Sequence, residues 1–227
     1  MSETRFLERF SPEERNEIER ISVRRPYRKG AIIFLSGDDA GEVLLIRSGQ
    51  IKLTVASVDG REILIGIRGP GEIIGEMSLI DQSPRSASAF ALTKVEMLVL
   101  PVREFTRLVD EDFGFSRKLL DEMCRKVRDS TMHQLELGLD DVPGRVARRL
   151  ATLMDRFGTD QPDGSTALRS PITQQELADW AGVSRQAVVK ELGRLRELGW
   201  LETKGASMNV RNPPEIYNRA SELSGLA

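Results

Sequence analysis

The feature that most constrains this chain is a series of short, β-rich apolar runs that ends near residue 101. The runs are AIIFL at 31–35, VLLIR at 43–47, IKLTVAS at 51–57, ILIGI at 63–67 and VEMLVL at 95–100. Turn signals separate them at 28–30, 36–41, 48–50, 59–61 and 69–71. Several short strands at roughly even spacing are typical of a β-barrel or a sandwich. The Asp59-Gly60 pair predicts a tight hairpin, because this dipeptide suits positive φ.

Helical signals flank the β-rich region. Ser11, Pro12 and Glu14 form a helix start with a capping box, and the helix continues to Ile21. A second helical pattern runs from Arg103 to about Leu139. Its later part carries a seam in steps of three and four residues: Ser116, Leu120, Met123, Val127, Ser130, Gln134 and Leu137. This spacing predicts a two-stranded coiled coil and therefore a homodimer; packing of the helix on its own domain is the alternative.

A joint follows the long helix, and we expect a domain boundary near residue 140. Asp141 can cap a further helix from Gly144 to about Phe157, with Pro143 suited to its first turn. Residues 157–171 are rich in Gly, Pro, Ser and Asp and are expected to form a loop.

The stretch TQQELADWAGVSRQAVVKELGRLREL at 173–198 predicts a helix-turn-helix. Thr173 and Glu176 form a capping box, Gly182 ends the first helix, and Ser184 caps the second. Long donors on the free face of the second helix suit base edges, since Arg pairs with guanine and Gln with adenine. We expect DNA contacts from Thr173, Gln175, Ser184, Arg185, Gln186, Val189 and Lys190. A helical hairpin with a solvated basic face is the alternative, but the hairpin wing expected at 200–210 favours DNA.

Several function classes are disfavoured by what the sequence contains. The net charge of −2 gives no sign of DNA binding by itself, so the basic patch must be local. One cysteine, Cys124, excludes an intrachain disulfide and a metal site of several thiolates, and one histidine, His133, makes zinc or Ser-His-Asp sites hard to build. The glycines at 69–75 have the wrong spacing for a dinucleotide fingerprint. We therefore expect no catalytic residue, no metal and no enzyme activity.

The length and flanks of the apolar runs also bear on location. The longest runs are only a few residues, so no membrane span is expected. The N-terminus, MSETRFLERF, is charged and lacks an apolar signal region. A cytoplasmic location is the default expectation.

Taken in order, these elements resemble the Crp–Fnr family of bacterial transcription regulators, and most closely its cyclic AMP-binding branch. The resemblance rests on the glycine-punctuated barrel, GEMSLIDQSPRSASA at 75–89, the long helix, DVPGR at 141–145 and ITQQELADWAGVSRQAVVKEL at 172–192. It implies an α+β chain: a cyclic-nucleotide-binding β-barrel (jelly roll) at 1–110, a dimerisation helix at 111–139 and a winged helix-turn-helix at 140–227. The implied partners are a second copy, palindromic double-stranded DNA, RNA polymerase and a cyclic nucleotide.

The resemblance also implies a phosphate-binding cassette within 75–89. In the family's pattern Gly-Glu…Arg-Ser/Thr-Ala, Arg85 offers a bidentate fork to phosphate, Ser86 adds a donor, and Glu76 accepts from the ribose 2′-OH. A short helix expected at 77–81 places its N-terminus near the anion. On the long helix, Ser130 and Thr131 match a hydroxyl pair that reads the base from both subunits, in swapped order. The implied nucleotide-binding residues are Gly75, Glu76, Met77, Arg85, Ser86, Ala87, Leu53, Ile65, Gly66, Ser130 and Thr131.

The effector remains open among several candidates. Cyclic AMP is the leading one; cyclic GMP, cyclic di-GMP, another effector or no ligand at all are the alternatives. The lone cysteine disfavours an iron–sulfur sensor. Haem bound through Cys124 or His133 is formally possible, but packing or surface roles are favoured for both. A nucleotide-binding subunit of some other enzyme conflicts with the reading helix.

The reading helix departs from the family pattern in two places. Gln186 and Lys190 stand where the cyclic AMP branch has Glu and Arg, and Ala187 replaces a Thr that contacts phosphate. Because Glu accepts from cytosine and Gln prefers adenine, we expect a half-site related to TGTGA but altered opposite Gln186.

Overall fold

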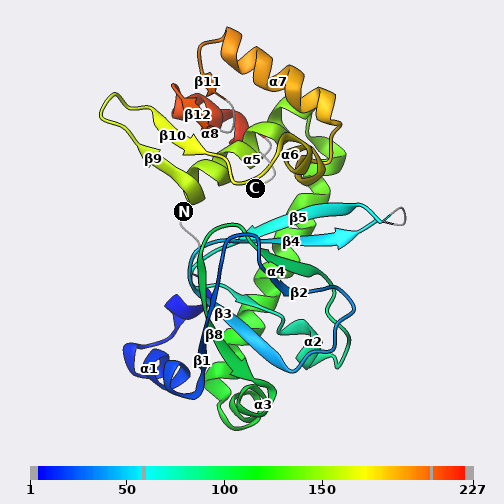
Figure 1. Ribbon diagram of the computed structural model, residues 1–227, viewed down its shortest axis with the longest axis vertical. Coiled ribbons are helices and arrows are strands. Elements are labelled where there is room, and N and C mark those ends of the chain that lie inside the picture. Colours follow the sequence, from blue (N-terminus) through cyan, green and yellow to red (C-terminus); the bar gives the residue numbers. More distant parts are fainter. Residues whose placement is uncertain (1–4, 58–59, 205–206, 223–227) are drawn as a thin grey trace. The chain divides into compact units, whose positions relative to one another are not determined.

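Two antiparallel sheets of four strands each build the first half of the chain in the computed structural model, which describes residues 5–57, 60–204 and 207–222 (Figure 1). One sheet has the order β1-β8-β3-β6 and the other the order β2-β7-β4-β5. The bounds are β1 Val23–Tyr27, β2 Ile32–Phe34, β3 Glu42–Ser48, β4 Ile51–Ala56, β5 Glu62–Arg68, β6 Ile73–Ile74, β7 Ser88–Ala91 and β8 Val95–Pro101. All five predicted runs are strands, whereas β1, β6 and β7 were not expected. The predicted hairpin joins β4 and β5, which pair antiparallel, but its residues 58–59 lie outside the described ones.

The central strands β3 and β8 are buried on both faces, which explains why their runs are apolar at nearly every position. Alternate residues of a strand point to opposite faces. Val43 and Leu45 of β3 therefore pack into a core cluster with residues of the helices, while Leu44 and Ile46 pack into a second cluster that draws on strands of both sheets. In the first cluster the rings of Phe6, Phe10 and Phe115 contact one another, and the ring of Phe105 contacts that of Phe115.

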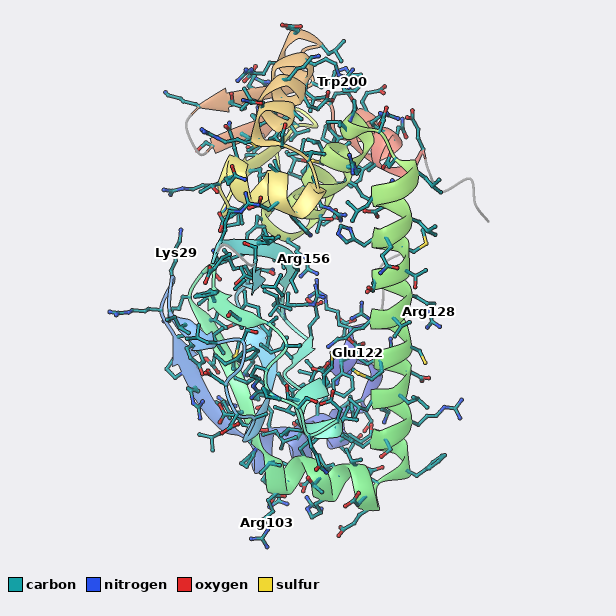
Figure 2. All side chains as sticks on the ribbon, turned by 90° about the vertical axis from the view of Figure 1, so that its right-hand side faces the viewer. Lys29, Arg103, Glu122, Arg128, Arg156 and Trp200 are labelled. Atoms are coloured by element: carbon teal, nitrogen blue, oxygen red, sulfur yellow. The ribbon has the colours of Figure 1, made fainter. Side chains whose placement is uncertain are left out.

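Helices cover the first cluster and lead out of the sheets. Their bounds are η1 Phe6–Arg9, α1 Pro12–Ile21, α2 Met77–Ile80, α3 Val102–Glu111 and α4 Phe113–Leu139. The predicted capping box at Ser11 is confirmed. The single helical pattern from residue 103 to 139 is interrupted at Asp112, because its carboxylate accepts from the backbone N–H of Phe115 at 3.0 Å and starts α4 there. Figure 2 shows the length of α4, with buried Glu122 on its inner side and exposed Arg128 on its outer side.

The chain divides into two units between Arg128 and Asp129, within α4. We call them the N-terminal unit and the C-terminal unit. The division into functional parts at 1–110, 111–139 and 140–227 stays a prediction.

The C-terminal unit combines four further helices with a small sheet (Figure 1). The helices are α5 Val142–Phe157, α6 Gln174–Ala181, α7 Arg185–Glu197 and α8 Pro213–Ser221. The strands, in the order β11-β12-β10-β9, are β9 Gly158–Asp160, β10 Thr166–Arg169, β11 Leu201–Lys204 and β12 Ser207–Val210. The expectation of a plain loop at 157–171 was wrong, because β9 and β10 form a hairpin that pairs with β12. The expected wing is the β11–β12 pair, whose residues 205–206 lie outside the described ones.

Across the described residues, the helices lack the combination of length and hydropathy that a bilayer-crossing segment needs.

Candidate nucleotide site and candidate DNA interface

The cassette begins at Gly75, directly after β6. The backbone conformation and the close approach of Arg85 require a glycine at this position. Its φ is +79°, and a Cβ there would lie 2.2 Å from Nη1 of Arg85. The missing side chain lets Arg85 come close enough for Nη1 to donate to the carbonyl oxygen of Gly75 at 2.7 Å. Arg85 Nη2 donates to the carbonyl oxygen of Glu42, also at 2.7 Å. The first and the second half of the cassette are thus joined through one guanidinium.

Arg85 is a buried cation, and one of its three side-chain nitrogens makes no hydrogen bond to the described residues. Its residue is 4% exposed, and its guanidinium lies 4.6 Å from the ring centroid of Phe34. Burial lowers the pKa of Arg85, and the nearby carboxylates of Glu42, Glu76 and Asp38 act against that lowering. Its Nε is buried and has no hydrogen-bond partner among the described residues. A buried donor without a partner is costly, so an anionic acceptor at this position would be stabilising.

Glu76 is the matching buried anion. It is 2% exposed, and its Oε1 accepts from Nζ of Lys126 at 2.8 Å. The same ammonium donates to the carbonyl oxygen of Ile73 at 3.0 Å, so α4 holds the start of the cassette. The second carboxylate oxygen, Oε2, is buried and has no hydrogen-bond partner among the described residues. Sequence reasoning missed Lys126, because a lysine on a helix carries no signal that it pairs with a residue 50 positions away.

The serines of the cassette divide into structural and accessible ones. Ser78 donates to the carbonyl oxygen of Pro84, and Ser88 accepts from the N–H of Ser36, so both hold the fold. Ser83 takes part in a turn, in which its backbone N–H donates to the carboxylate of Asp81 at 3.1 Å. Ser86 is exposed between buried Arg85 and buried Ala87. The helix after Glu76 is α2, a single turn that ends one residue before the expected position.

The residues expected beside the purine lie on the second sheet. Leu53 of β4 is paired with Gly66 of β5 on one side and with Ala89 of β7 on the other. The cassette therefore continues into a strand that contacts Leu53. Gly66 is buried, whereas Ile65 and Met77 are exposed.

The predicted seam on α4 is exposed only in part. Leu120 and Val127 are 61% and 65% exposed, which is unusual for large apolar side chains on one helix face. Met123, in contrast, packs against the first core cluster, and Ser116 donates from Oγ to the carbonyl oxygen of Val109. Both therefore make contacts within their own unit, and their place in a dimer seam stays a prediction.

Further along α4, the remaining seam and base-reading positions belong to the C-terminal unit. Ser130, Thr131, Gln134 and Leu137 are all exposed. The assignment of Ser130 and Thr131 to the base of a nucleotide stays a prediction.

Cys124 and His133 also lie on α4. Cys124 is exposed. His133 lies with Nδ1 2.6 Å from Nη2 of Arg149, whose guanidinium is 5.2 Å from the ring centroid of Trp180 and pairs with Glu136. His133 is thus part of a charged cluster that packs α4 against α5, in agreement with the packing role favoured from sequence.

The helix-turn-helix of the C-terminal unit has the predicted caps. Thr173 accepts from the N–H of Glu176 at 3.1 Å, and Ser184 accepts from the N–H of Ala187 at 3.1 Å. Gly182 ends α6 with φ of +63°, a left-handed conformation that favours glycine. Val188, Leu192 and Leu195 of α7 are buried, so its opposite face is left to solvent.

The expected DNA contacts gather on that open face and at the start of α6. Arg185, Gln186, Val189 and Lys190 are all exposed on the first turns of α7. Thr173 and Ser184 are exposed at the helix starts, and Gln175 donates to Asp179 on its own helix at 2.9 Å.

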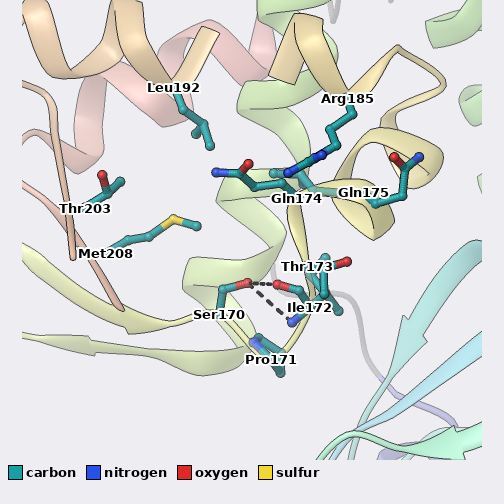
Figure 3. A pocket seen from close by; sticks show the side chains of 11 residues that line it. Ser170, Pro171, Ile172, Thr173, Gln174, Gln175, Arg185, Leu192, Thr203 and Met208 are labelled. Carbon is teal, nitrogen blue, oxygen red and sulfur yellow. Dashed lines mark hydrogen bonds between the residues drawn. The ribbon is translucent and has the colours of Figure 1, made fainter. Parts of the chain in front are cut away.

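A cavity of about 770 Å³ adjoins this face between α6, α7 and the wing (Figure 3). Figure 3 shows Arg185 reaching from α7 toward Gln174, with Met208 and Thr203 of the wing on the far side. The arrangement places a long donor, Arg185, beside the cavity, and such donors suit phosphates and base edges.

Comparison with known families gives two matches. Residues 24–112 match the family described as cyclic nucleotide-binding domain, and residues 144–218 match the Crp-like helix-turn-helix domain. The first match contains the cassette, and the second contains α6, α7 and the wing.

Individual relatives span nearly the whole chain. The CRP-like cAMP-activated global transcriptional regulator of Mycobacterium tuberculosis is 32% identical over 194 residues, which cover 86% of each protein. The solved catabolite activator protein of Thermus thermophilus is 30% identical, with a TM-score of 0.54, and covers 98% of this chain and 99% of its own. The c-di-GMP responsive regulator CLP of Xanthomonas campestris is 25% identical, with a TM-score of 0.70. The match covers 86% of this chain and 96% of that structure's chain.

Proposed function

Because the chain belongs to the Crp family of transcription regulators, which are not enzymes, we propose that it is a dimeric regulator switched by cyclic AMP. Its expected lack of catalytic activity agrees with these relatives. The nucleotide is proposed to bind in the cassette at residues 75–87, and palindromic DNA at α7. The cyclic AMP-activated relative supports the choice of nucleotide.

One observation carries the nucleotide part of the proposal: the cassette holds one unpaired buried donor and one unpaired buried acceptor. Within the part of the chain that the structure describes, Arg85 Nε has no acceptor and Glu76 Oε2 has no donor. A ribose cyclic phosphate supplies both, since a phosphate oxygen accepts from the guanidinium and the 2′-OH donates to the carboxylate. Lys126 keeps the other oxygen of Glu76 occupied, which directs Oε2 to the sugar.

Calorimetric titration of the full chain with cyclic AMP, cyclic GMP and cyclic di-GMP tests the effector. We expect cyclic AMP to bind with one site per chain. We expect 2′-deoxy cyclic AMP to bind about 10- to 100-fold more weakly, because a hydrogen bond to a charged group contributes about 1.5–3 kcal/mol.

The other outcomes each favour a different alternative. Tight binding of cyclic GMP or cyclic di-GMP instead of cyclic AMP overturns the choice of nucleotide. Absence of heat with all three, in a protein that still binds DNA, overturns the cassette assignment and favours another effector or none.

The DNA part of the proposal follows from the exposed face of α7 and from two-fold symmetry. A dimer that presents two reading helices binds two half-sites related by the same symmetry, hence a palindrome. We propose that the exposed stripe of α4 around Leu120 and Val127 forms the dimer seam. RNA polymerase is inferred as a partner because a regulator at a promoter acts on transcription, and the cytoplasm is retained as the expected location.

Replacing Gln186 by Glu is expected to change one base preference in each half-site. Gln pairs with adenine N6 and N7, whereas Glu accepts from cytosine N4. The Gln186→Glu variant should therefore move toward the TGTGA type, with about a 5- to 100-fold change in discrimination at that base pair. Selection from random DNA with both proteins measures the change.

Gln161→Glu is the matched control, since it makes the same substitution in the loop between β9 and β10. Gln161 donates there to the carbonyl oxygen of Thr159, away from α7. The Gln161→Glu variant should select the same DNA sequence as the wild type. Identical preferences for the wild type and Gln186→Glu rule out a base-reading role for Gln186.

A further inference from the structure

The reading face of α7 contains an apolar side chain that no charge or packing requirement explains. Among the residues of α7, all of them described, Val189 is the one large apolar side chain that is exposed, at 45%. Its neighbour Val188 is fully buried. Helical spacing places Val189 three and four residues after Gln186 and Arg185, and so on the same face as both.

The cations of α7 fall into two groups, and Val189 lies with the unpaired one. Arg194 pairs with Glu191 at 2.7 Å and Arg196 donates to Thr203 at 2.9 Å. In contrast, the side chains of Arg185, Gln186 and Lys190 form no hydrogen bond or ion pair with any described residue. The exposed valine is thus flanked by side chains with free donors. A partner that fits this surface offers hydrogen-bond acceptors to the donors and an apolar group to the valine.

We propose that Val189 reads the C5-methyl group of a thymine in the major groove. This inference rests on the proposed DNA binding and adds to it a base that no donor or acceptor of the chain specifies. The thymine methyl is the one apolar group that base pairs present in the major groove, and small apolar side chains contact it. Valine is well suited, because its branched side chain has one strongly preferred rotamer in a helix and holds its methyl groups in fixed positions.

The position of the thymine follows from the spacing on α7. Side chains three residues apart on a helix have Cβ atoms about 5–6 Å apart, and successive base pairs are about 3.4 Å apart. The thymine therefore belongs to the base pair read by Gln186 or to one within about two steps of it. Its methyl contributes about fourfold in affinity per half-site, as expected for one buried methylene-sized group.

Uracil substitution tests the contact without altering any hydrogen bond of the DNA. A site selected from random DNA with the full chain and saturating cyclic AMP is resynthesised with one thymine at a time replaced by deoxyuridine in both half-sites. The affinity of the wild type should fall about 16-fold when deoxyuridine replaces the thymine at one symmetric position, with a factor of about four from each half-site. Val189→Ala should bind the thymine site more weakly and show no further loss with deoxyuridine at that position.

Arg194→Ala is the control on the same helix, because Arg194 is engaged in an ion pair with Glu191. It should keep the wild-type response to deoxyuridine. Val189 is exposed, so its truncation leaves no cavity, and circular dichroism should show the wild-type unfolding temperature for Val189→Ala. A wild type indifferent to every deoxyuridine, or a Val189→Ala protein with an undiminished response, overturns the inference while DNA binding stands. A protein that binds no DNA overturns the proposed function and the inference with it.

Discussion

Arg85→Ala is expected to weaken cyclic AMP binding by about 100- to 10,000-fold. The guanidinium is proposed to donate two charge-assisted hydrogen bonds to the phosphate, one from Nε and one from the second N–H of a terminal nitrogen, each contributing about 1.5–3 kcal/mol. Alanine removes both donors and leaves the phosphate in a buried place beside Glu76, which is itself negatively charged. Calorimetry with cyclic AMP measures the loss.

The same substitution also weakens the fold, so affinity must be measured on folded protein. Arg85 donates to the carbonyl oxygens of Gly75 and Glu42, and each carbonyl left buried without a donor costs about 1–3 kcal/mol of unfolding free energy. Arg85→Lys keeps the positive charge but loses the fork, and should recover the affinity only in part.

The matched control for Arg85 is Arg25→Ala. Arg25 pairs with the carboxylate of Glu42 at 2.6 Å, whereas Arg85 donates to the carbonyl oxygen of the same residue. Arg25 itself lies outside the cassette. It should leave the affinity for cyclic AMP unchanged. A folded Arg85→Ala protein with wild-type affinity contradicts the cassette assignment.

The sequence predicted the strands whose pattern is local and missed those that depend on distant partners. The buried runs of β3 and β8 are apolar on both faces and are visible in any window. By contrast, β1 reads VRRPY, with two arginines and an exposed proline, and is a strand because it pairs with β8. In the same way, β10 lies in a stretch rich in turn residues and is ordered by pairing with β12. The helix α8 was missed although two prolines stand at its start, where Pro is tolerated.

The candidate site could be predicted as far as its motif reaches. Gly75 and Arg85 are ten residues apart, and the motif identified both ends of the contact that the structure forms between them. Lys126 and the backbone oxygen of Glu42 were not predictable, because they reach the cassette through tertiary packing from positions 50 and 43 residues away from their partners. The seam was predicted from the heptad spacing of its residues. Spacing alone does not show which of these residues pack into the core of their own unit, as Met123 does.

Val127→Glu is expected to convert the dimer into monomers. In one chain Val127 is 65% exposed, so a carboxylate there is solvated and the fold is kept. In the proposed seam, two carboxylates would face each other, and the dimer would lose the burial of two valine side chains at about 1.5–3 kcal/mol each. The dimer should weaken by about a thousandfold or more, as measured by sedimentation.

Loss of the dimer should also weaken DNA binding. A monomer contacts one half-site only, so affinity for a palindrome should fall as steeply as the dimer does. Arg128→Glu is the control: it places a carboxylate at the next position, on the outer side of α4 (Figure 2), and should leave the protein dimeric. Mixing Val127→Glu with Val127→Lys should restore a heterodimer, since opposite charges then meet across the seam. A Val127→Glu protein that sediments as a dimer excludes this face of α4 from the interface, and with it the arrangement of two reading helices on which the palindrome depends.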